Sequence, residues 1–135
     1  MRAMVLPKFG GADLFELRDV ERPEPGPRDI LVRIMAAAVN PVDAKIGADG
    51  SWAQLVPPLI LGYDAAGVVE KLGVGVVEFR SGDEVYYTAE IFPNRFGTYA
   101  EFSVVDAALV GHKPARLSFA EARQYRWRGA LRGKP

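Results

Sequence analysis

Short runs of apolar residues, separated by turn-forming residues, repeat along most of the chain. Two of these runs, 1–9 and 14–20, flank Gly10-Gly11, and the second alternates between apolar and polar side chains. Such a pair predicts a β-hairpin. Further strands are expected at 30–39, 60–73, 85–91, 96–105 and 108–110, with turn signals at intervals of about 8–12 residues. The pattern predicts a mainly β fold, either a small barrel or a sandwich.

Some segments depart from simple alternation. Residues 30–39 carry Arg33 as their only charge, which is typical of a central strand covered on both faces. Residues 21–27 contain three prolines and predict an extended connector, and 47–58 predict a loop. Within 60–73, the three glycines at 62, 67 and 73 suit β-bulges and tight corners of a barrel.

The stretch 39–45 is the first candidate for chemistry, because it brings an amide, a carboxylate and an amine together after an apolar run. Pro41 keeps Asn40 out of the helical region, so the strand should end at Asn40 and a short helix should follow. Lys45 lies one helical turn after Pro41, and Asn40 and Lys45 are therefore expected to reach one cleft. The alternative is purely structural: Asn-Pro marks an ordinary turn, and Asp43 stabilises a helix N-terminus.

Three other features also have both a structural and a functional interpretation. Trp52 either lines a substrate cleft or packs its loop onto the barrel. His112 reads as a residue of a surface turn at 111–114 rather than a metal ligand. Gly73-Val74-Gly75 begins like a dinucleotide-binding fingerprint, but Glu78 replaces the third glycine and no amphipathic helix follows, so a β-turn is predicted.

Composition limits the class of protein. The chain has 135 residues, of which 49% are hydrophobic and 25% charged, and these fractions fit one globular domain. It has no cysteine and one histidine, which excludes disulfides and an ordinary zinc site. No signal-peptide pattern and no apolar stretch of about 20 residues is present. We therefore expect a cytoplasmic protein without a membrane partner.

The zero net charge conceals an asymmetry. After Glu121 the chain carries a charge of +5 and no acid, so residues 1–121 carry −5. An acidic body argues against nucleic acid as the main partner, since phosphate binding needs clustered Lys and Arg. The expected domain therefore spans 1–121, and 122–135 form an atypical basic tail, expected to be disordered or a frayed helix begun at Ser118.

Four motifs occur in the order seen in one known family. They are the runs Ala38–Lys45, Leu61–Val69, Gly82–Val85 and Gly97–Phe102. In this respect residues 1–121 resemble the N-terminal GroES-like domain of medium-chain dehydrogenases/reductases, and most closely the zinc-independent quinone oxidoreductase branch. The resemblance implies a partly open β-barrel with short helices that carries the substrate side of the cleft.

The resemblance also implies roles for particular residues. Zinc-type members of the family carry a ligand cysteine at the position of Asn40 and a ligand histidine at that of Tyr63, so no zinc is expected. Asp64 corresponds to a glutamate near that metal, and Lys45 to a histidine beside the nicotinamide ribose. Asn40 and Lys45 are therefore the expected catalytic residues on the nicotinamide side, and Trp52, Tyr63 and Asp64 the expected substrate-binding residues.

The C-terminal segment departs from the family. Where relatives continue into a Rossmann domain that binds NADPH, this chain has the basic segment 123–135 and no such domain. The resemblance implies the catalytic domain of an NADPH-dependent quinone or enone oxidoreductase, which acts on a small-molecule substrate and is compatible with a homodimer. As a truncated chain it is expected to be inactive alone. The alternative is a non-enzymatic fragment or binding module that pairs with another chain.

Overall fold

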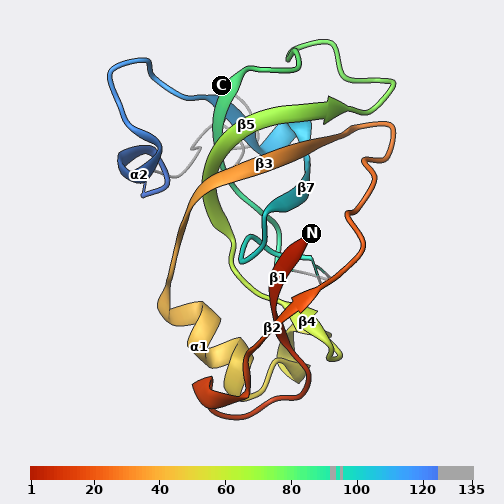
Figure 1. The fold of residues 1–135 in the computed structure, drawn as a ribbon, viewed down its shortest axis with the longest axis vertical. Helices are drawn as coiled ribbons and strands as arrows, with labels where there is room; N and C mark the ends of the chain where they lie inside the picture. Colours follow the sequence, from red (N-terminus) through yellow and green to blue (C-terminus); the bar gives the residue numbers. More distant parts are fainter. Residues whose placement is uncertain (92–93, 95, 125–135) are drawn as a thin grey trace.

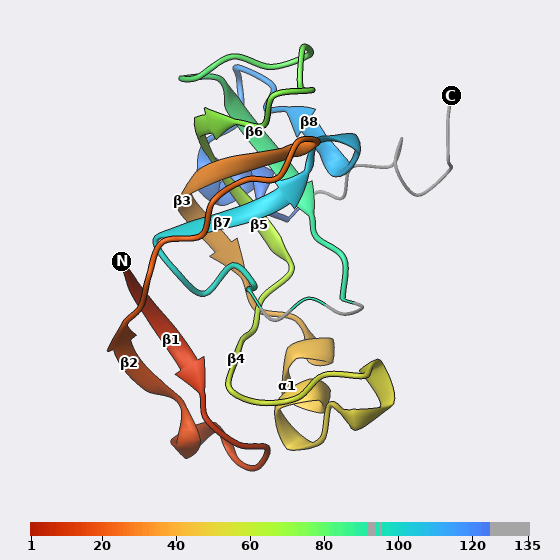
Figure 2. The same ribbon diagram turned by 90° about the vertical axis from the view of Figure 1, so that its right-hand side faces the viewer.

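The computed structural model describes residues 1–91, 94 and 96–124, and it contains two antiparallel sheets (Figures 1 and 2). The smaller sheet has the strand order β2-β1-β4, with β1 at Arg2–Leu6, β2 at Glu16–Asp19 and β4 at Leu59–Ile60. The larger has the order β7-β3-β5-β6-β8, with β3 at Asp29–Ala38, β5 at Asp64–Leu72, β6 at Glu84–Thr88, β7 at Phe102–Asp106 and β8 at Val110–His112. Neither sheet closes on itself, which confirms a mainly β, partly open architecture.

Two short helices and three 3₁₀ turns complete the described part of the chain. Helix α1, Pro41–Ala48, lies beside the smaller sheet in both views, and α2, Phe119–Ala122, packs against β3 and β5 (Figures 1 and 2). The 3₁₀ turns are Ala12–Leu14, Ser51–Ala53 and Ala107–Leu109. Ser118 caps α2, as the sequence predicted. Of the predicted basic tail, only 122–124 lie within the described residues.

One hydrophobic core joins both sheets to α1. Leu6 of the smaller sheet, Val32 and Val85 of the larger sheet, and Ile46 of α1 are fully buried and belong to one cluster. Ile46 is three residues after Asp43, so the helix face that enters this core also carries a carboxylate. The position of α1, and of the Asn40 turn before it, is thus fixed by burial of apolar surface.

The predicted hairpin and the predicted glycine corners are confirmed. β1 and β2 pair antiparallel from Arg2↔Asp19 to Val5↔Glu16. β5 pairs with β3, and the register shifts beside Gly67. A Cβ added at Gly67 would lie 2.2 Å from the carbonyl oxygen of Arg33, so the strands approach more closely than any larger residue permits. The Gly73–Gly75 segment is a turn, as predicted, and packs on the 21–27 connector.

Three predictions for the segment 96–112 were wrong. The run 96–105 is a strand only from Phe102, because the amides of Gly97, Thr98 and Tyr99 bond instead to carbonyls of 60–62. Asp106 accepts a hydrogen bond from Ala108 and starts a 3₁₀ turn where the last strand was expected. The last strand begins at Val110, so His112 ends a strand rather than occupying a turn.

The prediction for 30–39 was wrong in its second half. β3 is central in the sheet and buried at 30–32, but Met35 is 49% exposed and Val39 is 81% exposed. A continuous apolar run cannot distinguish two covered faces from one covered face beside an open apolar one.

Candidate functional site

Helix α1 begins at Asn40 for local reasons. Asn40 has extended backbone angles, φ −122° and ψ 157°, as a residue before proline requires, and Pro41 is the first helical residue. In a capping-box arrangement, the main-chain N–H of Asn40 donates to Asp43 Oδ2 at 2.8 Å. The structural alternative for this stretch is therefore realised, because Asn40 is an N-cap.

The Asp43 carboxylate does more than complete this cap. It is only 4% exposed, and its Oδ2 also accepts a hydrogen bond of 2.6 Å from the Tyr99 hydroxyl. Tyr99 lies 56 residues further along the chain, in the bend that precedes β7. A carboxylate can accept several hydrogen bonds at once, so Asp43 ties the start of α1 to this distant segment.

A second buried carboxylate holds the other end of Asn40. Asp64, the first residue of β5, is 6% exposed, and its Oδ2 accepts a hydrogen bond of 2.7 Å from Asn40 Nδ2. Its Oδ1 accepts one of 2.6 Å from the hydroxyl of Thr88, which lies directly opposite on β6. Each carboxylate thus takes one hydrogen bond from Asn40 and one from a hydroxyl group.

Tyr63 lies beside this network but is not hydrogen-bonded to it. Its side chain is 2% exposed, and its hydroxyl has no hydrogen-bond partner among the described residues. Burial, and to a smaller degree the Asp43 carboxylate, raises the pKa of Tyr63 to about 12. Burial, followed by the hydrogen bond to Asp43, also raises the pKa of Tyr99. Both phenols are therefore neutral near pH 7, and Tyr99 donates its proton to the hydrogen bond with Asp43.

The other predicted site residues lie outside the network. Lys45 is exposed on α1, as is Pro41 one turn before it, and its ammonium makes no hydrogen bond or ion pair within the described part of the chain. Trp52 lies in the 3₁₀ turn after α1 and is 52% exposed. The structure thus joins Asn40 to Asp64, with Tyr63 adjacent, and within the described residues no hydrogen bond or ion pair joins Lys45 to them.

The residues at the expected zinc positions do not suit a metal. Asn40 presents its amide N–H group, which is a donor and not a ligand, and both oxygens of Asp64 already accept hydrogen bonds. No cluster of three or more His, Cys, Asp or Glu side chains suited to a metal occurs within the described residues. The donor set therefore gives no basis for a catalytic step through zinc.

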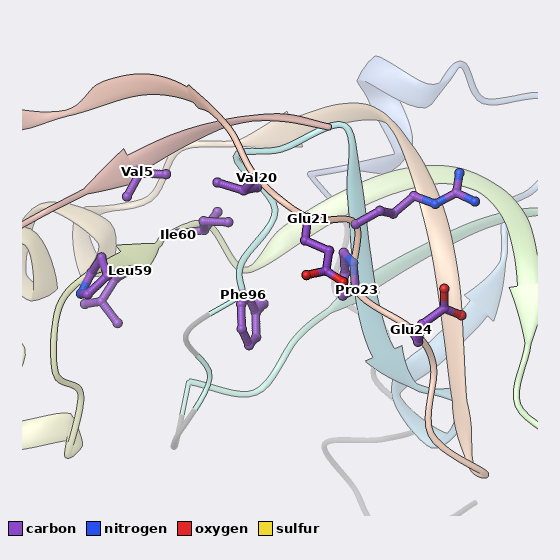
Figure 3. Close-up of a pocket in the computed structure, with 10 residues that line it drawn as sticks. Val5, Val20, Glu21, Pro23, Glu24, Leu59, Ile60 and Phe96 are labelled. Atoms are coloured by element: carbon purple, nitrogen blue, oxygen red, sulfur yellow. The ribbon is translucent and has the colours of Figure 1, made fainter.

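A hollow elsewhere on the surface contains none of the predicted residues. It has a volume of about 410 Å³ and lies between the connector and β4, with Val20, Pro23, Leu59 and Phe96 among its walls (Figure 3).

No helix within the described residues is long and apolar enough to cross a membrane.

An antiparallel, partly open fold with a polar network at the Asn-Pro turn defines a class of protein. Residues 26–115 match the family described as the alcohol dehydrogenase GroES-like domain. The chain belongs to this family and thus to the medium-chain dehydrogenases/reductases, which confirms the resemblance seen in its motifs.

Particular relatives narrow the comparison. The chain is 39% identical, over 90% of its length, to an NADPH-dependent alkenal/one oxidoreductase of Arabidopsis thaliana, and 41% identical, also over 90%, to a 2-methylene-furan-3-one reductase of Solanum lycopersicum. It spans 33% of the length of each. Among solved structures, the quinone oxidoreductase of Coxiella burnetii matches 96% of this chain and 42% of its own, with a TM-score of 0.86 and 30% identity.

Sequence reasoning missed two members of the network, Thr88 and Tyr99. Thr88 lies within the predicted strand 85–91 and ends the observed β6, and its pairing with Asp64 depends on which strands are neighbours. Tyr99 was noted only as part of a family motif. The Tyr99 hydroxyl, two residues after Gly97 in a predicted strand, is a weak sign of a functional residue. Only the path of residues 97–99 in the folded chain brings it to Asp43.

Proposed function

We propose that this chain is the substrate-side catalytic domain of a zinc-independent, NADPH-dependent oxidoreductase that reduces an enone or a quinone. The support from its relatives is that one is named an NADPH-dependent alkenal/one oxidoreductase and another a 2-methylene-furan-3-one reductase. NADPH, held by a nucleotide-binding domain, supplies the hydride when bound. The part left to this chain is to orient the acceptor and to donate hydrogen bonds to its oxygen.

The observation that carries the proposal is the fixed amide of Asn40. One N–H of Nδ2 is used by Asp64, which leaves its second N–H to donate. An enone or quinone depends less on a metal ion for its activation than an alcohol does, because hydride attacks a carbon that is already electron-poor. A donor at its oxygen stabilises the enolate or phenolate that results. In this proposal Lys45 supplies a second donor, and Trp52 and Tyr63 line the substrate side.

The test is turnover in a two-domain protein, made by joining this chain to the nucleotide-binding domain of a relative. Asn40→Ala and Lys45→Ala are expected to lower kcat for an enone by about 10²–10³, the cost typical of a lost donor. Lys8→Ala removes another exposed lysine, which takes no part in the hydrogen bonds around Asn40, and should leave turnover unchanged.

Because Asn40 is also a helix cap, its loss must be separated from loss of helix stability. Asn40→Ser keeps a good N-cap but has no amide to reach Asp64. We expect Asn40→Ser to retain the melting temperature more closely than Asn40→Ala while losing turnover to the same extent. Full turnover in both Asn40→Ser and Lys45→Ala would refute the assignment of this stretch to the site.

A further inference from the structure

We propose that Asp43 and Asp64 are positioning residues that clamp Asn40 by its main chain and its side chain, with Tyr99 and Thr88 holding the two carboxylates in place. We call these five residues the Asn40 clamp. The role of the clamp in turnover rests on the proposed function. The clamp itself is a property of this chain and can be tested without any measurement of turnover.

The clamp removes both kinds of freedom that Asn40 has. The hydrogen bond from its main-chain N–H to Asp43 fixes the backbone at the start of α1. The hydrogen bond from Nδ2 to Asp64 fixes the side chain. Because a carboxylate only accepts hydrogen bonds, Asp64 also determines which way the amide faces, with the nitrogen and not the oxygen toward β5. The amide is thus held in one orientation.

The hydroxyl groups extend this control to the sheet. Tyr99 donates to the same Asp43 oxygen that accepts from Asn40, and Thr88 donates to the second oxygen of Asp64. The strands β5 and β6 and the bend before β7 therefore define the position of Asn40, although Asn40 itself lies between β3 and α1. Groups placed on rigid elements are held more accurately than groups on a loop alone.

The arrangement exceeds what a helix cap needs, and α2 in the same molecule provides the comparison. Its cap consists of Ser118 and Glu121, which are both exposed and satisfy each other without further residues. The cap of α1 instead buries two carboxylates, neither of which forms an ion pair within the described residues. Burial of carboxylates without an ion pair is costly, and Asp43 Oδ1 has no hydrogen-bond partner among the described residues. The four short hydrogen bonds therefore offset part of that cost, and the loss of any donor makes it larger.

The test uses the chain itself and NMR signals of Asn40. Tyr99→Phe and Thr88→Val each remove one hydroxyl and little else, and Thr98→Val is the matched control. Thr98 is also a buried threonine, 1% exposed and next to Tyr99, but its hydroxyl has no partner among the described residues. Circular dichroism shows whether each variant is folded. If one of them does not fold, Asp64→Asn is the replacement variant, because an amide at position 64 can both donate and accept and so lets the Asn40 side-chain amide flip.

In Tyr99→Phe we expect hydrogen exchange at the Asn40 main-chain amide to accelerate on the order of tenfold, the equivalent of one hydrogen bond to a charged group. In Thr88→Val the two side-chain amide protons of Asn40 should shift toward their solvent-exposed positions. Thr98→Val should change neither signal. Wild-type signals in both hydroxyl variants, or an equal change in Thr98→Val, would overturn the clamp.

The same variants in the two-domain protein connect the clamp to turnover. Thr88→Val should lower kcat about tenfold or more with KM little changed, because a misplaced donor acts mainly on the transition state. If the Asn40 signals move as expected but kcat does not, the clamp stands and the catalytic role of Asn40 fails. Unmoved Asn40 signals would instead refute the clamp, whatever the turnover.

Discussion

Tyr63→Phe tests the electrostatics beside the Asn40 clamp, because it removes one buried hydroxyl and keeps the ring. The pKa of Tyr63 is about 12, whereas an unfolded chain has the ordinary value of about 10. Below pH 10 the phenol is protonated in both states and contributes no pH dependence. Between pH 10 and 12 only the unfolded state releases the proton, so the free energy of unfolding falls as pH rises. The difference of about two pH units corresponds to a loss of about 2–3 kcal/mol that Tyr63→Phe should not show.

The assay is urea denaturation of both proteins at pH 8.5 and at pH 11.5, together with an absorbance titration of tyrosinate. The other tyrosines and the lysines are shared, so the difference between the two proteins isolates Tyr63. At pH 8.5 the variant should be as stable as wild type or up to about 1 kcal/mol more stable, since the hydroxyl it lacks has no partner among the described residues. An equal fall in stability for both proteins, or a clear loss at pH 8.5, would refute this reasoning.

Three further outcomes are expected. Gly67→Ala should lower the free energy of unfolding by about 1–3 kcal/mol or prevent folding, because its Cβ would meet the Arg33 carbonyl oxygen. Gly47→Ala in α1, whose Cβ would lie 3.7 Å from the nearest side-chain atom, should leave that free energy unchanged or raise it. Urea denaturation of both variants measures the two changes. After dialysis against a chelator the protein should hold no stoichiometric zinc, and one retained zinc per chain by elemental analysis would contradict the proposed zinc-independent site. The 135-residue chain alone should neither bind NADPH in a saturable, salt-resistant manner by fluorescence titration nor reduce a simple quinone.

Much of the fold followed from local sequence chemistry. The Gly10-Gly11 turn, the connector 21–27 and the helix that starts after Asn40 each depend on residues close together in the chain, and each was predicted correctly. Proline and glycine act on their own backbone, so their effects can be read without knowing the tertiary structure.

The errors arose where distant backbone decided the outcome. Residues 96–101 alternate like a strand, yet the amides of 97–99 bond to the carbonyls of 60–62. Only isolated bridges form at Phe96 and Ala100, and the continuous strand begins at Phe102. The site showed the same division. The sequence identified Asn40 and Asp64 separately, but their hydrogen bond spans 24 residues and depends on how β3, α1 and β5 meet.

The clamp also changes how the helix-cap alternative bears on function. A cap and a catalytic amide are competing interpretations of Asn40 in the sequence, but the structure makes them compatible, since the main-chain N–H donates to Asp43 while Nδ2 donates to Asp64. Asp64, predicted to contact substrate, has both oxygens occupied by protein donors, and it therefore fits a role in orienting Asn40 better than a role in binding a ligand. Asn40 and Asp64 are joined to each other, and Asp64 to Thr88, so the order of the proposed site comes from buried hydrogen bonds.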